Sequence, residues 1–132
     1  MKRLSVIFLF SFVVNIVWEN AHSFLYANYM GGSITETILA QAALWDAIII
    51  TFICLPFLYI GALEKKSWLI IILGMAVAIA IELYALKTGR WAYNVYMPII
   101  PIIRIGLTPT VQLGALGYFS FLIQRKLFNK LT

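Results

Sequence analysis

Four long apolar segments constrain this chain more than any other feature of its sequence. The first three cover about residues 4–26, 42–63 and 68–86, and the fourth covers about 107–123. A helix rises ~1.5 Å per residue and the hydrocarbon layer of a bilayer is ~30 Å thick, so about 20 apolar residues can cross it. We therefore predict an all-α integral membrane bundle of four transmembrane helices, forming one domain over residues 1–132.

The composition supports this prediction and excludes other classes of protein. Of the 132 residues, 63% are hydrophobic and only 11% are charged, whereas about 25% of residues are charged in a typical soluble domain. Four spans leave no room for a soluble catalytic domain. The net charge of +5 would suit a nucleic-acid partner, but the basic residues lie at the ends of apolar segments rather than on one face. We expect contact with membrane lipid and none with nucleic acid.

The basic residues also predict the orientation of the bundle. Seven fall on one side of a four-span topology and three on the other: Lys2, Arg3, Lys65, Lys66, Arg125, Lys126 and Lys130 against Lys87, Arg90 and Arg104. The positive-inside rule then places both termini in the cytoplasm. The outer connection between the third and fourth spans contains Pro98 and Pro101. It cannot form one straight helix, and we expect an interfacial or re-entrant segment.

Each predicted span carries a polar or ionisable residue in the outer half of the bilayer. Counted at ~1.5 Å per residue from the cytoplasmic ends, the depths are roughly 22 Å for Glu19, 27 Å for His22, 27 Å for Asp46, 21 Å for Glu82 and 18 Å for Gln112. These side chains are predicted to lie in one layer.

The spacing in the first span predicts that its polar face points into the protein. Asn15, Glu19, His22 and Tyr26 are separated by four, three and four residues, which places them along one stripe of a helix. A charged side chain near the bilayer centre costs about 2.5–3.5 kcal/mol on insertion scales and usually faces a bundle interior or a wet cavity. We expect this stripe to face the bundle interior.

A buried layer of carboxyl groups can perform acid–base chemistry. Burial disfavours the charged form of a carboxyl group, so that it can hold a proton at neutral pH, and aromatic faces stabilise nearby cations. Such a pocket could protonate or deprotonate a lipid-like or isoprenoid-like molecule. The catalytic candidates are Glu19 and Glu82, as acid and base, with Asp46. The candidates for binding the ligand, or for pairing with these carboxylates, are His22, Trp18, Arg90, Trp91, Tyr93, Arg104 and Gln112.

The sequence gives no reason to expect a cofactor or a metal. One histidine among scattered carboxylates is a weak metal signature, so that hydrogen bonding is the expected role of His22. The HExxH, CxxC, G-x-S-x-G and Gly-rich phosphate-loop patterns do not occur.

Other interpretations of the polar layer stay open. The carboxylates could lie close enough to the outer interface to be solvated, with Trp18, Trp45 and Trp91 forming an aromatic belt. The chain could be a small proton-coupled transporter that works as a homodimer, with Glu19 or Glu82 as the coupling site. It could also be an accessory subunit, whose polar layer holds helices together or docks a partner membrane protein.

Two sequence patterns together resemble a family of small bacterial membrane proteins. Near the start, Trp18-Glu19-x2-His22-x2-Leu25-Tyr26 matches a W-E-x-x-(H/Q)-x-x-L-Y element of that family. Near the end, the matching residues are Trp91-x-Tyr93-x3-Met97-Pro98 and Gly106-Leu107-x-Pro109-x2-Gln112. The resemblance implies four spans in a bacterial membrane, which we expect to be the inner membrane, and carries no catalytic activity with it.

Overall fold

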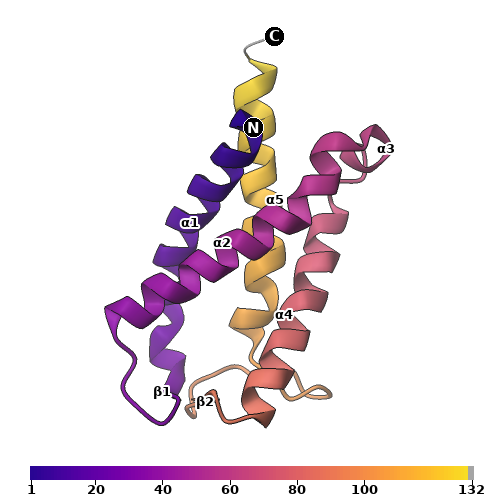
Figure 1. Cartoon of the computed structure of the whole chain (residues 1–132). Coiled ribbons are helices and arrows are strands. Elements are labelled where there is room, and N and C mark those ends of the chain that lie inside the picture. The colour runs from indigo at the N-terminus through magenta and orange to yellow at the C-terminus, as the bar shows by residue number, and fades with distance from the viewer. Residues whose placement is uncertain (131–132) are drawn as a thin grey trace.

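The computed structural model describes residues 1–130, in which four long helices run in alternating directions (Figure 1). The start of α1 and the end of α5 lie at one end of the bundle, and two short strands lie at the other. The elements in order are α1 (Lys2–His22), a 3-10 turn η1 (Ser23–Leu25), β1 (Tyr26–Tyr29), α2 (Glu36–Tyr59), α3 (Gly61–Glu64), α4 (Leu69–Lys87), β2 (Trp91–Tyr93) and α5 (Leu107–Asn129).

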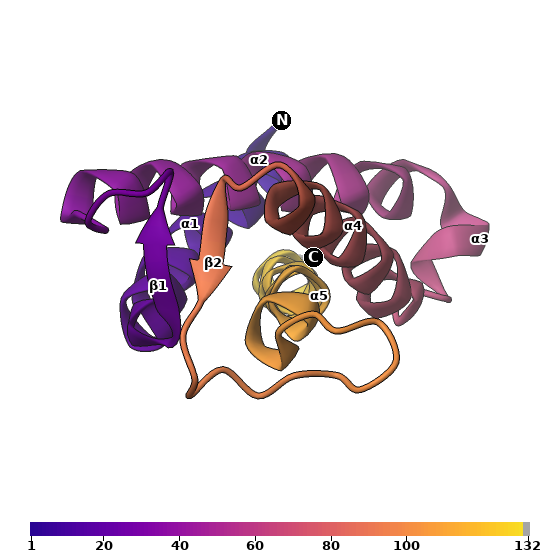
Figure 2. The ribbon, with the colours of Figure 1, turned by 90° about the horizontal axis from the view of Figure 1, so that it is seen from below.

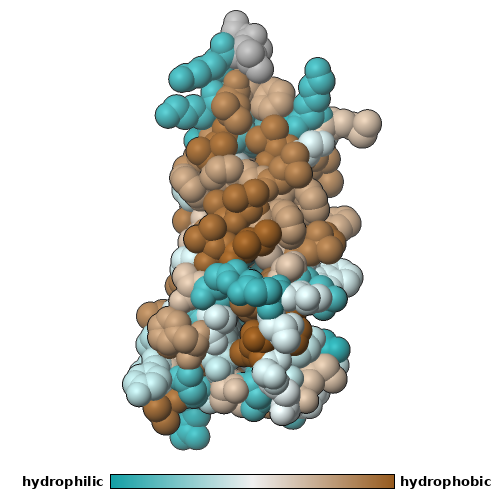
Figure 3. Space-filling model, turned by 90° about the vertical axis from the view of Figure 1, so that its left-hand side faces the viewer, coloured by the Kyte–Doolittle hydropathy of each residue, from teal (hydrophilic) through white to brown (hydrophobic). Residues whose placement is uncertain are grey.

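Three of the helices confirm the prediction of a helical membrane protein. In residues 1–130, α1 (with η1), α2 and α4 are long and apolar enough to cross a membrane. Large apolar side chains such as Val17, Phe52 and Ile72 are more than half exposed, while Ser11 and Asn15 are fully buried. On the face shown in Figure 3, hydrophobic residues form a band across the middle and hydrophilic residues gather at both ends. Apolar side chains outside and polar ones inside suit a bundle surrounded by lipid.

Helix α5 has a different composition from the other three. It is 23 residues long, and its buried residues include Thr110, Gln112, Ser120 and Gln124. It packs against α1, α2 and α4, so these polar groups face neighbouring helices. This helix places a polar stripe in the interior of the bundle.

Two glycines allow α4 and α5 to approach closely. A Cβ atom added to Gly74 would lie 2.4 Å from the Cα of Gly114, and one added to Gly114 would lie 2.4 Å from the Ile71 carbonyl oxygen. Any larger side chain here would push the backbones apart, since real Cβ contacts are longer. The contact sets the relative height of Glu82 and Gln112, which lie within about two turns of it.

The connections at the end of the bundle opposite the termini form a two-stranded antiparallel ribbon, which the all-α prediction did not include. Tyr26 pairs with Tyr93 and Tyr29 with Trp91, with an irregularity after Tyr26. Figure 2 shows the ribbon crossing this end of the bundle beside α5. The chain leaves helix α1 at His22, so Tyr26 is on a strand and does not continue the helical stripe.

Two further local features complete this end of the molecule. Helix α2 begins at Glu36, earlier than the apolar segment that predicted it, and the Thr35 hydroxyl accepts a hydrogen bond from the backbone N–H of Ile38. Residues 94–106 form a loop in which Leu107 N–H donates to the Pro98 carbonyl at 2.7 Å and Ile100 N–H donates to the Ile105 carbonyl at 2.9 Å. This loop carries the chain from the ribbon to the start of α5.

Candidate functional site

The buried face of α1 contributes three polar residues to the interior. Asn15 is fully buried, the Glu19 side chain is 13% exposed and His22 is 5% exposed. Their spacing of four and three residues puts them on one face, as predicted from the sequence. Asn15 is oriented by a 2.8 Å hydrogen bond from its Nδ2 to the Ser11 carbonyl, which leaves its side-chain oxygen facing the layer.

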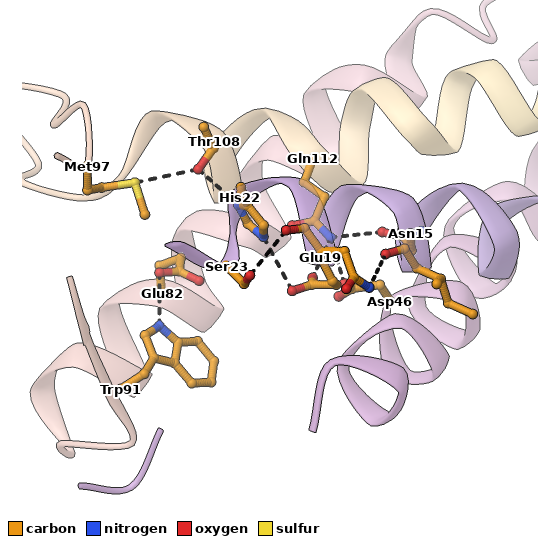
Figure 4. Close-up of polar contacts among 12 residues, drawn as sticks. Asn15, Glu19, His22, Ser23, Asp46, Glu82, Trp91, Met97, Thr108 and Gln112 are labelled. Carbon is orange, nitrogen blue, oxygen red and sulfur yellow. Dashed lines mark hydrogen bonds and ion pairs between the residues drawn. The ribbon is translucent and has the colours of Figure 1, made fainter. Parts of the chain in front are cut away.

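Gln112 on α5 is the centre of the polar layer (Figure 4). Its Nε2 lies 2.8 Å from Asn15 Oδ1, 2.7 Å from Glu19 Oε1 and 2.8 Å from Asp46 Oδ2. One amide nitrogen thus faces acceptors from α1 and α2. It carries only two hydrogens for these three oxygens, so it cannot donate a separate hydrogen to each of them.

Glu19 and Asp46 meet at this amide. Both carboxyl groups contact the same nitrogen of Gln112, at 2.7 Å and 2.8 Å. A carboxylate can only accept a hydrogen bond, so a direct hydrogen bond between the two groups requires a proton on one of them. The arrangement therefore suits a pair of carboxyl groups that shares one proton.

His22 forms the other side of the Glu19 environment. Its Nε2 lies 3.3 Å from Glu19 Oε2, and its Nδ1 lies 3.0 Å from the Thr108 hydroxyl, which contacts Met97 Sδ at 3.5 Å. When both ring nitrogens carry hydrogens, the ring is a cation paired with Glu19. This geometry fits the hydrogen-bonding role expected for His22. In residues 1–130, no group of three or more His, Cys, Asp or Glu residues is arranged to hold a metal ion.

Glu82 belongs to a neighbouring cluster that involves the ribbon. This buried carboxylate accepts hydrogen bonds from Trp91 Nε1, at 3.1 Å, and from the Tyr93 hydroxyl. The same hydroxyl accepts a 3.0 Å hydrogen bond from the backbone N–H of Gly106. Burial, followed by the hydrogen bond to Glu82, raises the pKa of Tyr93 well above its ordinary value, so the phenol stays a donor. Glu82 therefore ties α4 to the ribbon and to the start of α5.

Two cavities adjoin these clusters. The smaller one, about 40 Å³, is lined by Asp46, Glu82 and Gln112 together with apolar residues of α4 and α5. A polar cavity of this size is large enough to hold water. Asp46 and Glu82 both line it, so the cavity lies between the two carboxyl clusters.

The larger cavity, about 90 Å³, lies between the end of α1, the ribbon and the start of α2. Its polar end contains Glu19, and the ribbon side contains Tyr26, Tyr29 and Trp91. The remaining lining residues are Ser23, Asn28, Ile34, Ile38, Leu39 and Ala42. Its walls are mainly apolar, and the Glu19 carboxyl group forms part of them.

Three of the predicted site residues lie outside these hydrogen-bonded clusters. Arg90 and Arg104 are exposed and form no ion pair within residues 1–130; the Arg90 guanidinium lies over the Tyr84 ring instead. Trp18 is half-buried, with its ring 6.0 Å from the His22 ring, and its indole N–H is buried without a hydrogen-bond partner among the described residues. The expected pairing of the carboxylates with basic residues is therefore limited to His22.

Several site residues were not among the predicted candidates. Asn15 was on the predicted stripe, and its position there could have identified it. Tyr26 was on the stripe as well, but it reaches the site through the ribbon. Nothing in the sequence distinguished Thr108 or Tyr29 from other polar residues near the ends of helices.

Comparisons with protein-family models, with curated proteins and with solved structures gave no match to this chain.

Proposed function

We propose that the protein binds a hydrophobic molecule of lipid-like or isoprenoid-like character and acts on it by acid–base chemistry. One observation supports this most directly: the larger cavity has mainly apolar walls and reaches Glu19, which converges with Asp46 on the Gln112 amide. Ligand sites are typically apolar clefts with a few convergent polar groups. A carboxyl group at the end of such a cleft is within reach of a bound molecule.

In this proposal Glu19 is the catalytic residue and Asp46 its proton partner. Glu19 lines the cavity, while Asp46 lies behind it and contacts the smaller cavity together with Glu82. A proton given to the ligand by Glu19 is replaced from Asp46, and one taken from the ligand passes back to it. Gln112 holds the two groups in position through its bonds of 2.7 Å and 2.8 Å.

Glu82 has a supporting role rather than the role of second catalytic group. Its two hydrogen-bond donors come from the ribbon, and one of them, Trp91, is a wall of the larger cavity. Glu82 positions that wall, and through the smaller cavity it can exchange protons with Asp46 by way of water.

The proposed topology has four spans, with both termini in the cytoplasm of a bacterial inner membrane. It is supported by four long helices that alternate in direction, with α2 strongly tilted, and by the start of α1 and the end of α5 lying at the same end of the bundle (Figure 1). Seven of the ten basic residues belong to this end in a four-span topology. Helix α5, with 23 residues, is long enough to be the fourth span. In this orientation the ligand cavity opens near the outer face.

Site-specific photocrosslinking tests the proposed ligand. A photoreactive benzoylphenylalanine replaces Ile38, which lines the cavity, and in a control it replaces Phe52, which is 72% exposed on α2. After illumination in native membranes, we expect an adduct of discrete mass at position 38 that is lost in a Glu19→Gln background. Identical lipid adducts at both positions, unaffected by Glu19→Gln, would contradict the proposal.

A structural role is the second candidate, and the arrangement around Gln112 favours it. This side chain joins α5 to α1 and α2 through buried hydrogen bonds, as expected of a layer that only holds helices together. The two roles differ in outcome. A purely structural layer predicts that Glu19→Gln lowers stability while no discrete adduct forms at position 38 in any variant.

A further inference from the structure

The larger cavity has a one-sided distribution of charge. Its ten lining residues include one carboxyl group, Glu19, and no Lys, Arg or His. The nearest basic side chain, His22, is already engaged by Glu19 and Thr108. Arg90, next to Trp91 in sequence, is exposed, with its guanidinium over the Tyr84 ring. An anionic head group would therefore find a carboxyl group and no cationic partner.

The aromatic residues of the cavity extend this preference. The rings of Tyr29 and Trp91 stack with centroids 6.4 Å apart and an interplanar angle of 19°, and Tyr26 meets Trp91 edge-on, also at 6.4 Å. Rings of this kind attract cations, and clusters of them recognise quaternary ammonium groups. Burial, and then the charge of Glu82, raise the pKa of Tyr26, so this ring stays neutral.

The hydrogen bond of Trp91 strengthens the same effect. Its indole N–H donates to Glu82 at 3.1 Å, and hydrogen bonds in a low-dielectric interior polarise the groups that they join. Donation to a carboxylate leaves the ring richer in electrons, which makes its face more attractive to a cation. Three carboxyl groups and a single histidine lie in or beside the polar layer.

We propose that the ligand of this cavity is a hydrophobic cation, an alkylammonium whose charged head lies between Glu19 and the rings of Tyr26, Tyr29 and Trp91. This inference rests on the proposed function, because it assumes that the cavity is a ligand site. The volume of about 90 Å³ is several times the ~30 Å³ that one water molecule occupies in the liquid. This space is of the size of a small ammonium head group, with the alkyl tail leaving past Ile34, Ile38 and Leu39 into lipid.

The experiment compares two probes that differ only in charge. An alkyltrimethylammonium and its neutral analogue, with carbon in place of nitrogen, are titrated into the protein in nanodiscs of zwitterionic lipid, and binding is followed by tryptophan fluorescence. An alkylsulfonate of equal chain length is the anionic probe. The variants are Glu19→Gln and Tyr29→Leu, with Glu36→Gln, an exposed carboxylate at the start of α2, as the matched control. Circular dichroism verifies that each variant is folded.

We expect the cation to bind at least about tenfold more tightly than the neutral analogue, because a desolvated cation–π contact and a carboxylate each contribute on this scale. Glu19→Gln should remove most of this ratio, Tyr29→Leu should reduce it, and Glu36→Gln should leave it unchanged. If the neutral probe binds as tightly as the cation, and Ala42→Phe, which fills the cavity, abolishes binding of both, the inference is overturned and the proposed function stays intact. If no probe binds in a way that depends on Glu19 or Ala42, both fail.

Discussion

Replacing Gln112 by methionine tests whether the polar layer is organised around this residue. Methionine nearly preserves the volume of the side chain but has no N–H group. The two hydrogens of the Gln112 amide serve three acceptors at 2.7–2.8 Å, two of them carboxyl oxygens. A buried acceptor left without its donor costs about 1–3 kcal/mol, and interhelical bonds in membrane proteins average ~0.6 kcal/mol. With two bonds lost next to ionisable groups, we expect a loss of about 2–4 kcal/mol.

Gln124→Met on the same helix is the matched control. Gln124 is fully buried, accepts one 2.9 Å hydrogen bond from Arg3, and has a buried Nε2 with no partner among the described residues. Its replacement removes one bond and also one unpaired donor, so we expect a change of less than about 1 kcal/mol. Both variants are unfolded by sodium dodecyl sulfate in mixed micelles and followed by circular dichroism. A Gln112→Met variant as stable as Gln124→Met would refute the central role of Gln112.

Three further predictions concern the elements around the site. Gly114→Val should separate α4 from α5 and destabilise the fold by about 1–3 kcal/mol or more, because its Cβ would lie 2.4 Å from the Ile71 carbonyl oxygen. Gly61→Ala should be neutral in the same unfolding assay, because a Cβ atom added there meets no atom within 4 Å. Because the pKa of Tyr93 is raised in the folded state, the stability that its neutral phenol provides is complete below about pH 10 and is lost as the pH rises above it. Tyr93→Phe cannot ionise but lacks the bond to Glu82, so it should be less stable at neutral pH and should lose less stability between about pH 9 and pH 11. A parallel loss of stability in both proteins would contradict this. Trp18→Phe removes a buried N–H that has no partner among the described residues, so the unfolding midpoint should stay the same or rise, and a clear fall would contradict this expectation.

The heights of the polar residues were predictable from the sequence, and their partners only in part. The spacing of Asn15, Glu19 and His22 fixes one helical face, and counting residues along each helix brings Asp46 and Gln112 to a similar depth. These five do form one network. Hydrophobic patterning carries this information because burying polar groups in lipid is costly, which forces such a face inward.

The separate position of Glu82 could not be predicted in this way. Residue counting gives a height along a helix but not the direction in which the side chain points relative to its neighbours. Glu82 turns toward Trp91 and Tyr93, which reach it because they pair with β1 across the end of the bundle. Strands of three and four residues leave no periodic signal, and their pairing depends on contacts between distant parts of the chain. The exposed position of Arg90 has the same origin, since it directly precedes β2.

The most direct test of the central claim, a ligand held at the Glu19–Asp46 pair, is native mass spectrometry of the protein released from nanodiscs. The wild type, Glu19→Gln, Asp46→Asn and the control Glu36→Gln are compared after purification from the same cells. We expect a discrete small molecule bound to the wild type and to Glu36→Gln, and its loss from both site variants while they remain folded. A wild type that carries no such molecule, or one that the site variants retain at equal occupancy, would contradict it.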